Sequence, residues 1–132
     1  MTELFQPLAR GLGDAPALID EAGTTSWRQL DERANRIIGA LRARGVGDGA
    51  TIAVMVGNRR EFFEIFAAVC HASWVAVPVN WHYTQDEAQY LLTDSAVKLL
   101  LIHADLYEPI KQAIPADLQV VIVDTPPETR EL

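Results

Sequence analysis

The sequence has little cysteine and no long apolar run, and each scarcity excludes a class of protein. Cys70 is the only cysteine in the 132 residues, so neither an internal disulfide nor a multi-cysteine metal site can form. We therefore expect a reducing, cytoplasmic setting. The most apolar stretch, residues 65–79, contains His71, Ser73 and Pro78 and is shorter than the roughly 20 residues of a membrane span. The first residues also lack the basic and apolar segments of a secretory signal, so we expect no membrane span.

Positive charge is scarce as well. There are 18 acidic and 11 basic side chains, which gives a formal net charge of -7. Such a chain repels phosphate backbones and anionic lipid headgroups, so we expect no nucleic-acid partner. The composition, 49% hydrophobic and 22% charged, is that of a folded globular domain with one core.

Metal-ligand patterns are missing too. His71, His82 and His103 are spaced too irregularly to match a common local metal motif. His71 lies near the end of a predicted helix, where the helix dipole favours a histidine. His103 lies at the end of a predicted strand, where its imidazole is expected to be solvated. Cys70 lies on an apolar helix face, where a buried small hydrophobe is the expected role. The sequence therefore predicts no metal site.

What is present first is a hairpin followed by a helix. The segments 17–20 and 24–27 flank Glu21-Ala22-Gly23, a short connection typical of a β-hairpin. Ser26 and Gln29 have capping-box spacing, and apolar residues then recur at helical intervals up to Arg44. Gly45 is a natural stop, so Gly45–Gly49 is predicted to end a helix and turn, although its glycines also resemble a phosphate loop.

The rest of the chain alternates apolar runs with amphipathic segments. Strands are predicted at 51–56, 74–79, 97–102 and 119–123, because these runs are short, apolar and lack polar alternation. Helices between them begin at capping-box spacings, Asn58 with Glu61 and Thr84 with Glu87, and a shorter helix covers 105–114. Such alternation predicts an α/β fold with a mainly parallel sheet and flanking helices.

The helix after Asn58 carries an aromatic-rich face. Phe62, Phe66, Val69 and Cys70 share one side, and we expect that side to be deeply packed. Replacing Phe66 with alanine should then cost about 3 to 5 kcal/mol.

Two turns at the carboxyl ends of predicted strands can bind ligands. In Gly57-Asn58-Arg59-Arg60 the two arginines can hold an anion at a helix start, although a capped helix with solvated arginines is the preferred interpretation. Residues 80–83, Asn-Trp-His-Tyr, lie where open α/β sheets bind ligands. They can line a pocket, but packing against further structure is the preferred interpretation.

Several segments, in order, resemble the adenylate-forming (AMP-binding, ANL) enzymes, and acyl-CoA synthetases most of all. Ser26-Trp27-Arg28-Gln29-Leu30 with Ala34-Asn35 is similar to the family's opening Thr-Tyr-x-Glu-Leu and Ala-Asn. Residues 45–58 resemble Gly-Val-x-x-Gly-Asp-x-Val-Ala-x-x-x-x-Asn, and residues 77–98 resemble its Val-Pro-x-Asn, Leu-Thr-x-x-Glu and Asp-Ser-x-Ala-Lys series. Ser73-Trp74 stands where the family often has Gly-Ala.

The resemblance implies a parent enzyme that adenylates a carboxylic acid with ATP and magnesium and passes the acyl group to coenzyme A. The family's phosphate loop ending in Pro-Lys-Gly, its ribose-binding acidic residue and its carboxyl-terminal lysine do not occur in this sequence. No catalytic, cofactor-binding or metal residue is therefore assigned, and the 132 residues alone are expected to be inactive. The expected partner is the remainder of the parent enzyme, with self-association as a further possibility.

The resemblance also implies a division near Gly49 into a hairpin and helix segment (1–49) and a parallel α/β segment (50–124). The polar, proline-containing tail (125–132) is predicted to be a linker or truncated continuation. Other readings stay open. The parent can be an aryl- or amino-acid-adenylating ligase, since the acid-binding residues are not identified. The chain can also be a flavodoxin-like binding or oligomerisation module.

Overall fold

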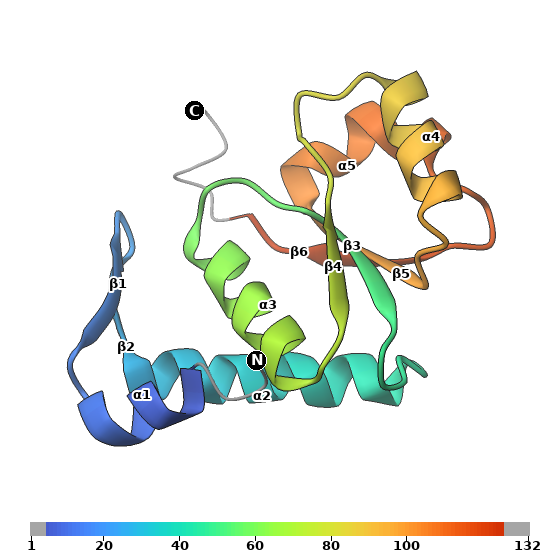
Figure 1. The fold of residues 1–132 in the computed structure, drawn as a ribbon. Coiled ribbons are helices and arrows are strands. Elements are labelled where there is room, and N and C mark those ends of the chain that lie inside the picture. The colour runs from blue at the N-terminus through green and yellow to red at the C-terminus, as the bar shows by residue number, and fades with distance from the viewer. Residues whose placement is uncertain (1–4, 126–132) are drawn as a thin grey trace. The chain divides into compact units, whose positions relative to one another are not determined.

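The computed structural model describes residues 5–125, which form two compact units. The first unit contains the described residues up to Ala50 together with Asn58–Val75. The second contains Thr51–Gly57 and the described residues from Ala76 on. The elements are α1 (Phe5–Leu12), β1 (Pro16–Asp20), β2 (Gly23–Ser26), α2 (Trp27–Ala43), β3 (Thr51–Met55), α3 (Arg60–His71), β4 (Val75–Pro78), α4 (Gln85–Asp94), β5 (Leu99–His103), α5 (Ala104–Ile110), the 3-10 turn η1 (Lys111–Ala113) and β6 (Gln119–Val123) (Figure 1).

The predicted hairpin and helix open the first unit. β1 and β2 pair antiparallel, with Asp20 opposite Gly23 at the tip. The chain then enters α2 through a complete capping box: Ser26 Oγ accepts from the Gln29 N–H, and the Gln29 side chain accepts from the Ser26 N–H. Both predictions are confirmed.

The glycine-rich segment after α2 ends the helix, as predicted. Gly45 has a φ of +87°, and its N–H donates to Arg42 O, while the Val46 N–H donates to Leu41 O. This pair of bonds is the Schellman motif, in which a left-handed residue satisfies the last carbonyls of a helix. Leu41 and Val46 are both buried beside it. The glycines therefore serve backbone geometry.

α3 ends in the same motif but without a glycine. Ser73, at a φ of +56°, donates its N–H to Cys70 O, and the Trp74 N–H donates to Val69 O. The Trp74 indole N–H also donates to Gly47 O at 2.8 Å, so the tryptophan is buried just before β4 begins. A residue with a Cβ thus occupies a conformation that favours glycine.

The start of α3 differs from the prediction. The N-cap is Arg59, not Asn58, and it makes no side-chain capping bond. Glu61 consequently lies one position too early to complete a capping box with it. Arg60, at the first helical position, forms a tertiary ion pair with Asp20, a contact that the local spacing does not reveal.

The expected deep packing of the Phe66 side of α3 is only partly confirmed, because Val69 is buried but Phe66 is not. Phe63 and Phe66 are 46% and 44% exposed, whereas Ile65, Ala67 and Ala68 are buried. Ala67 and Ala68 form a core with Leu30 and Ala34 of α2, because small side chains let the two helices approach closely. The rings instead form a surface chain in which Phe66 contacts Phe62 and Phe5.

The second unit contains a four-stranded sheet in the order β4-β3-β5-β6. β3 pairs in parallel with β5, and β5 with β6, in continuous register. All five β5 residues are buried, and the apolar run Leu99–Ile102 predicts this burial for the first four. The mainly parallel α/β fold is therefore confirmed.

The helices of this unit agree less closely with the bounds predicted from the sequence. Thr84 and Glu87 form the predicted capping box at the start of α4. The helix predicted at 105–114 is shorter, because α5 ends at Ile110 and passes into η1. Pro109 lies in its last turn and lacks the N–H that would continue the helix ladder.

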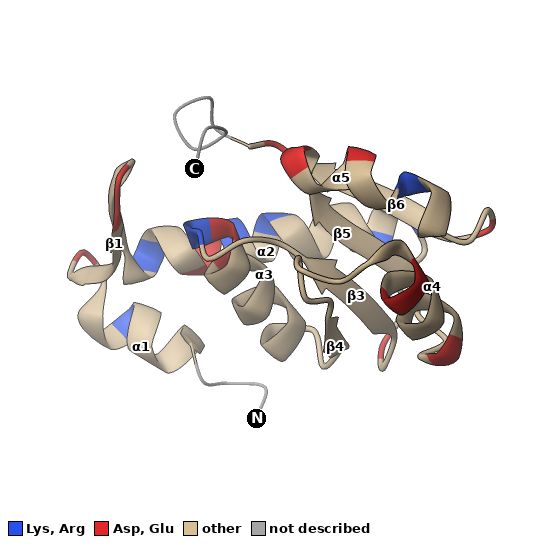
Figure 2. Cartoon of the chain, turned by 90° about the horizontal axis from the view of Figure 1, so that it is seen from above, with Lys and Arg blue, Asp and Glu red and all other residues tan. Residues whose placement is uncertain are grey.

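In Figure 2 acidic residues lie on α4 and basic residues along α2. No helix among residues 5–125 is long and apolar enough to cross a membrane.

Candidate functional site

The carboxyl edge of the sheet in the second unit is the first place to look for a site, because open parallel sheets bind ligands there. Four segments begin at that edge: residues 56–57 after β3, 79–83 after β4, 104–105 after β5 and 124–125 after β6, and His103 is the last residue of β5. The polar side chains in these segments are mostly used to hold the segments themselves.

His103 shows this most clearly. Its side chain is fully buried at the end of β5, and its Nδ1 accepts a hydrogen bond from the Gly57 N–H at 2.9 Å. The imidazole thereby ties the turn after β3 to the end of β5. The expectation that His103 is simply solvated is wrong, since burial at a strand end requires a polar partner.

Asp105 and Thr125 form a second link across the same edge. Thr125 Oγ1 donates to Asp105 Oδ1 at 2.8 Å and accepts from the Asp105 N–H. This pair connects the first turn of α5 to the segment after β6. Thr125 is buried, and the rest of the predicted linker, residues 126–132, lies outside the described residues.

The loop of residues 80–83 is the exposed part of the edge. Asn80 forms the turn, because its Oδ1 accepts from the His82 N–H and its backbone oxygen from the Tyr83 N–H. Trp81 packs on the His82 ring with the two centroids 3.6 Å apart. Trp81 and Tyr83 both remain exposed, so within this unit they line no enclosed pocket.

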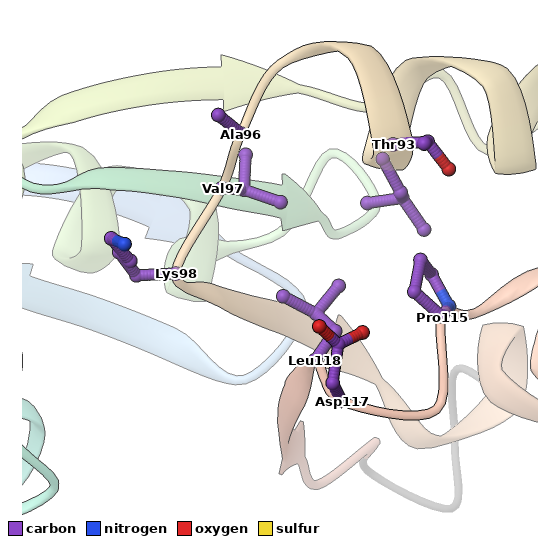
Figure 3. Close-up of a pocket in the computed structure, with 8 residues that line it drawn as sticks. Thr93, Ala96, Val97, Lys98, Pro115, Asp117 and Leu118 are labelled. Carbon is purple, nitrogen blue, oxygen red and sulfur yellow. The ribbon is translucent and has the colours of Figure 1, made fainter.

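A cavity of about 340 Å³ lies at the opposite edge of the sheet (Figure 3). It is lined by the end of α4, the segment before β5 and the segment before β6, with Lys98 and Asp117 as its charged side chains. These are the amino ends of the strands, where open α/β sheets do not place ligands. Both charged residues are solvent-exposed.

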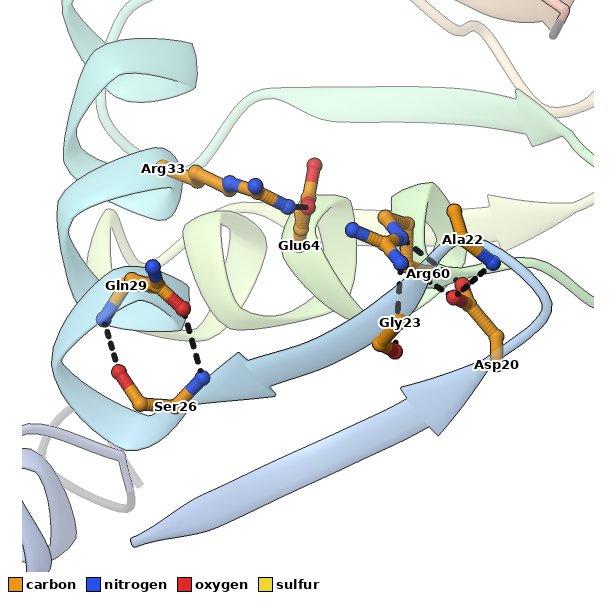
Figure 4. A network of polar contacts seen from close by, with 8 residues as sticks. All are labelled: Asp20, Ala22, Gly23, Ser26, Gln29, Arg33, Arg60 and Glu64. Carbon is orange, nitrogen blue, oxygen red and sulfur yellow. Dashed lines mark hydrogen bonds and ion pairs between the residues drawn. The ribbon is translucent and has the colours of Figure 1, made fainter. Parts of the chain in front are cut away.

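The arginine turn before α3 is occupied by a tertiary ion pair in the first unit. Arg60 Nε donates to Asp20 Oδ2 at 2.8 Å, and its Nη2 donates to Asp20 Oδ1 and to Gly23 O (Figure 4). This bidentate pair lowers the pKa of Asp20, chiefly through the Arg60 hydrogen bond. Arg60 therefore binds the hairpin. Of the two arginines that were proposed to hold an anion, Arg60 already has a carboxylate partner.

Three arginines of α2 also form ion pairs with carboxylates. Arg33 pairs with the mostly buried Glu64 at 2.6 Å, and Arg28 and Arg42 pair with exposed carboxylates of Asp14 and Asp48. No local pattern in the sequence predicts the pairs that join Asp20 to Arg60 and Arg33 to Glu64, because their partners are 40 and 31 residues apart.

His71 differs from its predicted role as well. Its side chain is only 2% exposed, and its Nδ1 lies 3.7 Å from Asp31 Oδ1. Burial lowers the pKa of His71 and the Asp31 carboxylate opposes that change. The helix dipole is therefore outweighed by desolvation, and a neutral imidazole is favoured.

The remaining candidates are structural. Cys70 is half-buried, and burial raises the pKa of its thiol, which disfavours the reactive thiolate. Across residues 5–125 no three His, Cys, Asp or Glu side chains lie close enough to hold a metal ion.

Comparison with known proteins gives the family. Residues 5–132 match the family described as AMP-binding enzyme. Tyrocidine synthase 2 of Brevibacillus parabrevis is 33% identical over 94% of this chain, which corresponds to 3% of that protein. A fatty acid–acyl-carrier-protein ligase of Streptomyces coeruleorubidus is 33% identical over 86% of the chain and 20% of its own length.

A solved structure of an enzyme with a similar fold agrees with this family match. The benzoate CoA ligase from Burkholderia xenovorans LB400 superposes with a TM-score of 0.86 at 26% identity, over 92% of this chain and 25% of that one. The chain thus spans a quarter or less of these proteins. By its family match over residues 5–132 and by its fold, the chain belongs to the AMP-binding, adenylate-forming enzymes.

Proposed function

We propose that this chain is the amino-terminal part of an ATP-dependent acyl-CoA synthetase. In the proposed reaction a carboxylate attacks the α-phosphorus of ATP to give an acyl-adenylate and pyrophosphate. The thiol of coenzyme A then attacks the acyl carbon, which gives a thioester and releases AMP. ATP, magnesium and coenzyme A would act in the parent enzyme, in the cytoplasm.

The observation that carries this proposal is the family match over residues 5–132. The order of the motifs from Ser26 to Lys98 supports it, as does the resemblance of the fold to a benzoate CoA ligase. A stand-alone flavodoxin-like module is disfavoured, because it would have no reason to share these segments in this order.

Within the parent, this chain serves as scaffold. The polar groups at the carboxyl edge, His103 with Gly57 and Asp105 with Thr125, hold the strand ends in place. Oriented donors and a metal clamp around developing charge are worth several kcal/mol each in phosphoryl and acyl transfer. The described residues offer no such group, so the catalytic residues are proposed to lie elsewhere in the parent.

A second candidate is another adenylate-forming ligase, with an aryl or amino acid as substrate. It is favoured by the 33% identity to tyrocidine synthase 2 and by 30% identity over 91% of the chain to a 3-hydroxybenzoate–CoA ligase of Aromatoleum. The two candidates differ in the acid, and an amino-acid-activating parent would differ also in the thiol that accepts it.

The test uses the full gene product that contains this chain. It is incubated with Mg-ATP, a panel of fatty, aryl and amino acids, and either coenzyme A or an acyl-carrier protein. The proposal predicts AMP release and an acyl-CoA product by mass spectrometry. Turnover of aryl or amino acids alone, or an adenylate formed without transfer to coenzyme A, would contradict it and favour the second candidate.

A further inference from the structure

α3 ends in a buried histidine whose polar atoms are unpaired. The His71 side chain is 2% exposed, and neither ring nitrogen has a hydrogen-bond partner among residues 5–125. Its Nδ1 lies 3.7 Å from Asp31 Oδ1 on α2, too far for a hydrogen bond, and that oxygen has no hydrogen-bond partner in the described part of the chain either. Buried polar atoms are normally paired, so this arrangement is unusual for a purely structural site.

A ring from α1 covers this histidine. The centroid of the Phe5 ring lies 6.0 Å from that of the His71 ring, with the two rings tilted by 61°. The same Phe5 ring contacts Trp27 and Phe66, with the centroids 6.4 Å apart in both pairs. Phe5 is the first residue of α1, so the helix brings an apolar ring against the imidazole and against two other aromatic side chains.

α1 has no buried residue, and a hinge follows it. The structure describes all eight residues of α1, and none is buried, although the helix packs along α2 (Figure 1). Such segments open at a low cost in free energy. Gly13, directly after α1, has a φ of +44°, a conformation that glycine enters and leaves with little strain. Beyond it the Arg28 N–H donates to Gly13 O and the Trp27 N–H to Ala15 O. The amino-terminal end of α1 can therefore swing out about Gly13 while the chain after it stays attached to α2.

The groups around His71 decide how a charged imidazole is accommodated. From α2, the Asp31 carboxylate acts on it. α3 adds the thiol of Cys70, the preceding residue, while α1 faces the imidazole with the uncharged Phe5 ring and carries Arg10 as its one ionisable residue. Burial lowers the pKa of His71, and the opposing effect of Asp31 is smaller. A charged His71 is therefore poorly accommodated under Phe5, and displacing Phe5 is the smallest change that lets it reach water.

We propose that α1 is an acid-released cover, which swings away about Gly13 when His71 takes up a proton. Near neutral pH the uncharged imidazole leaves Phe5 packed on Trp27 and Phe66. In mild acid the released helix uncovers these two rings, so an apolar surface of the first unit opens. The device uses residues of α1, α2 and α3 alone and is independent of the proposed function: it gives the parent a response to acidification whatever acid the parent activates.

Hydrogen exchange followed by mass spectrometry tests the release in the full gene product that contains this chain. Protection factors, which correct for the intrinsic pH dependence of exchange, are compared at about pH 7.5 and about pH 5. A solvated histidine titrates near pH 6.5, so we expect the protection of α1 to fall about tenfold over this range. At the lower pH α2 should remain about 100-fold more protected than α1. Constant protection of α1 would overturn the proposal, and so would equal protection of α1 and α2 at the lower pH, because the whole unit would then open together.

His71→Gln removes the titrating group. In this variant α1 should keep the same protection at both pH values, whereas in His82→Gln, which changes the exposed loop after β4, the protection of α1 should fall as in the wild type. A wild-type fall in the His71 variant, or no fall in the His82 variant, would place the sensor elsewhere and overturn the proposal.

Asp31→Asn changes a quantity that a packing role alone does not. The Asp31 carboxylate stabilises the imidazolium while α1 is in place, so its loss should make the release more complete and enlarge the fall in α1 protection about threefold. Asp48→Asn, which removes an exposed carboxylate paired with Arg42, should leave the fall unchanged. A fall in the Asp31 variant no larger than that in the Asp48 variant would overturn the proposal. This readout also decides the case if His71→Gln does not fold.

Discussion

At the scale of single residues, Ser73 and His71 carry the clearest consequences of the structure. Ser73 takes the left-handed conformation that closes α3, although glycine adopts it with less strain. His71 is buried beside Asp31 and has a lowered pKa. Neither feature was evident from the sequence, because a left-handed turn and a buried imidazole depend on how α3 ends and packs.

Ser73→Gly should stabilise the chain by about 0.5 to 1 kcal/mol. Relief of the left-handed strain exceeds the greater entropy that glycine has in the unfolded chain. Urea unfolding measures the difference. Ala40→Gly, in the interior of α2, is the control and should destabilise by about 1 kcal/mol. A loss of stability in the Ser73 variant would show that the turn is unstrained.

His71 should make the free energy of unfolding fall in mild acid. In the unfolded chain a histidine binds its proton near pH 6.5, whereas folded His71 binds it only at lower pH. The unfolded state therefore holds more protons between those two values, so stability is full above about pH 7 and declines as the pH falls through 6.5.

Substitution separates His71 from the other titrating groups. His71→Gln should give a flatter stability profile between about pH 7 and 5, measured by urea unfolding at each pH. His82→Gln, in the exposed loop after β4, should keep the wild-type slope. An unchanged slope in the His71 variant would exclude this residue as the source.

At the scale of elements, the sequence predicts local order well and tertiary contacts poorly. The hairpin, both capping boxes and the parallel strands follow from patterns within a few residues. The start of α3, the buried face of α3 and the ion pairs depend on residues 31 or more positions apart. Periodicity shows that α3 has an apolar stripe, but not which part of it meets α2.

The packing of α3 implies that its buried apolar residues contribute more to stability than its exposed aromatic ones. Ile65→Ala should cost about 2 to 5 kcal/mol because Ile65 is 3% exposed. Phe66→Ala should cost only about 1 to 2 kcal/mol in the same chain, since almost half of the ring is already in water. Thermal or urea unfolding compares the two, and a larger cost at Phe66 would restore the original expectation.

The hairpin is joined to α3 by the Asp20–Arg60 pair, whose side chains are 22% and 15% exposed. Arg60→Met should cost about 1.5 to 3 kcal/mol, because the Asp20 carboxylate loses a charged, mostly buried partner. Arg28→Met is the matched control, since its pair with Asp14 is exposed and should contribute little. Similar costs for both variants in urea unfolding would contradict a specific tie.

At the scale of the whole molecule, the family and the α/β fold were predictable, but a catalytic site was not. The motif order from Ser26 to Lys98 is similar to that of the adenylate-forming enzymes, and the family match agrees. The polar residues at the carboxyl edge, His103 above all, hold strand ends together. No spacing within the sequence identifies such a role, because it arises when β3 and β5 become neighbours.

The central claim is that this chain is the scaffold part of an adenylating ligase whose catalytic groups lie elsewhere in the parent. Carboxylate-dependent exchange of radiolabelled pyrophosphate into ATP tests it most directly, with the 132-residue chain and the full parent assayed side by side in Mg-ATP. The account predicts exchange by the parent and none above background by the 132-residue chain. Robust exchange by the 132 residues alone, or its absence in the folded parent with every class of acid, would contradict it.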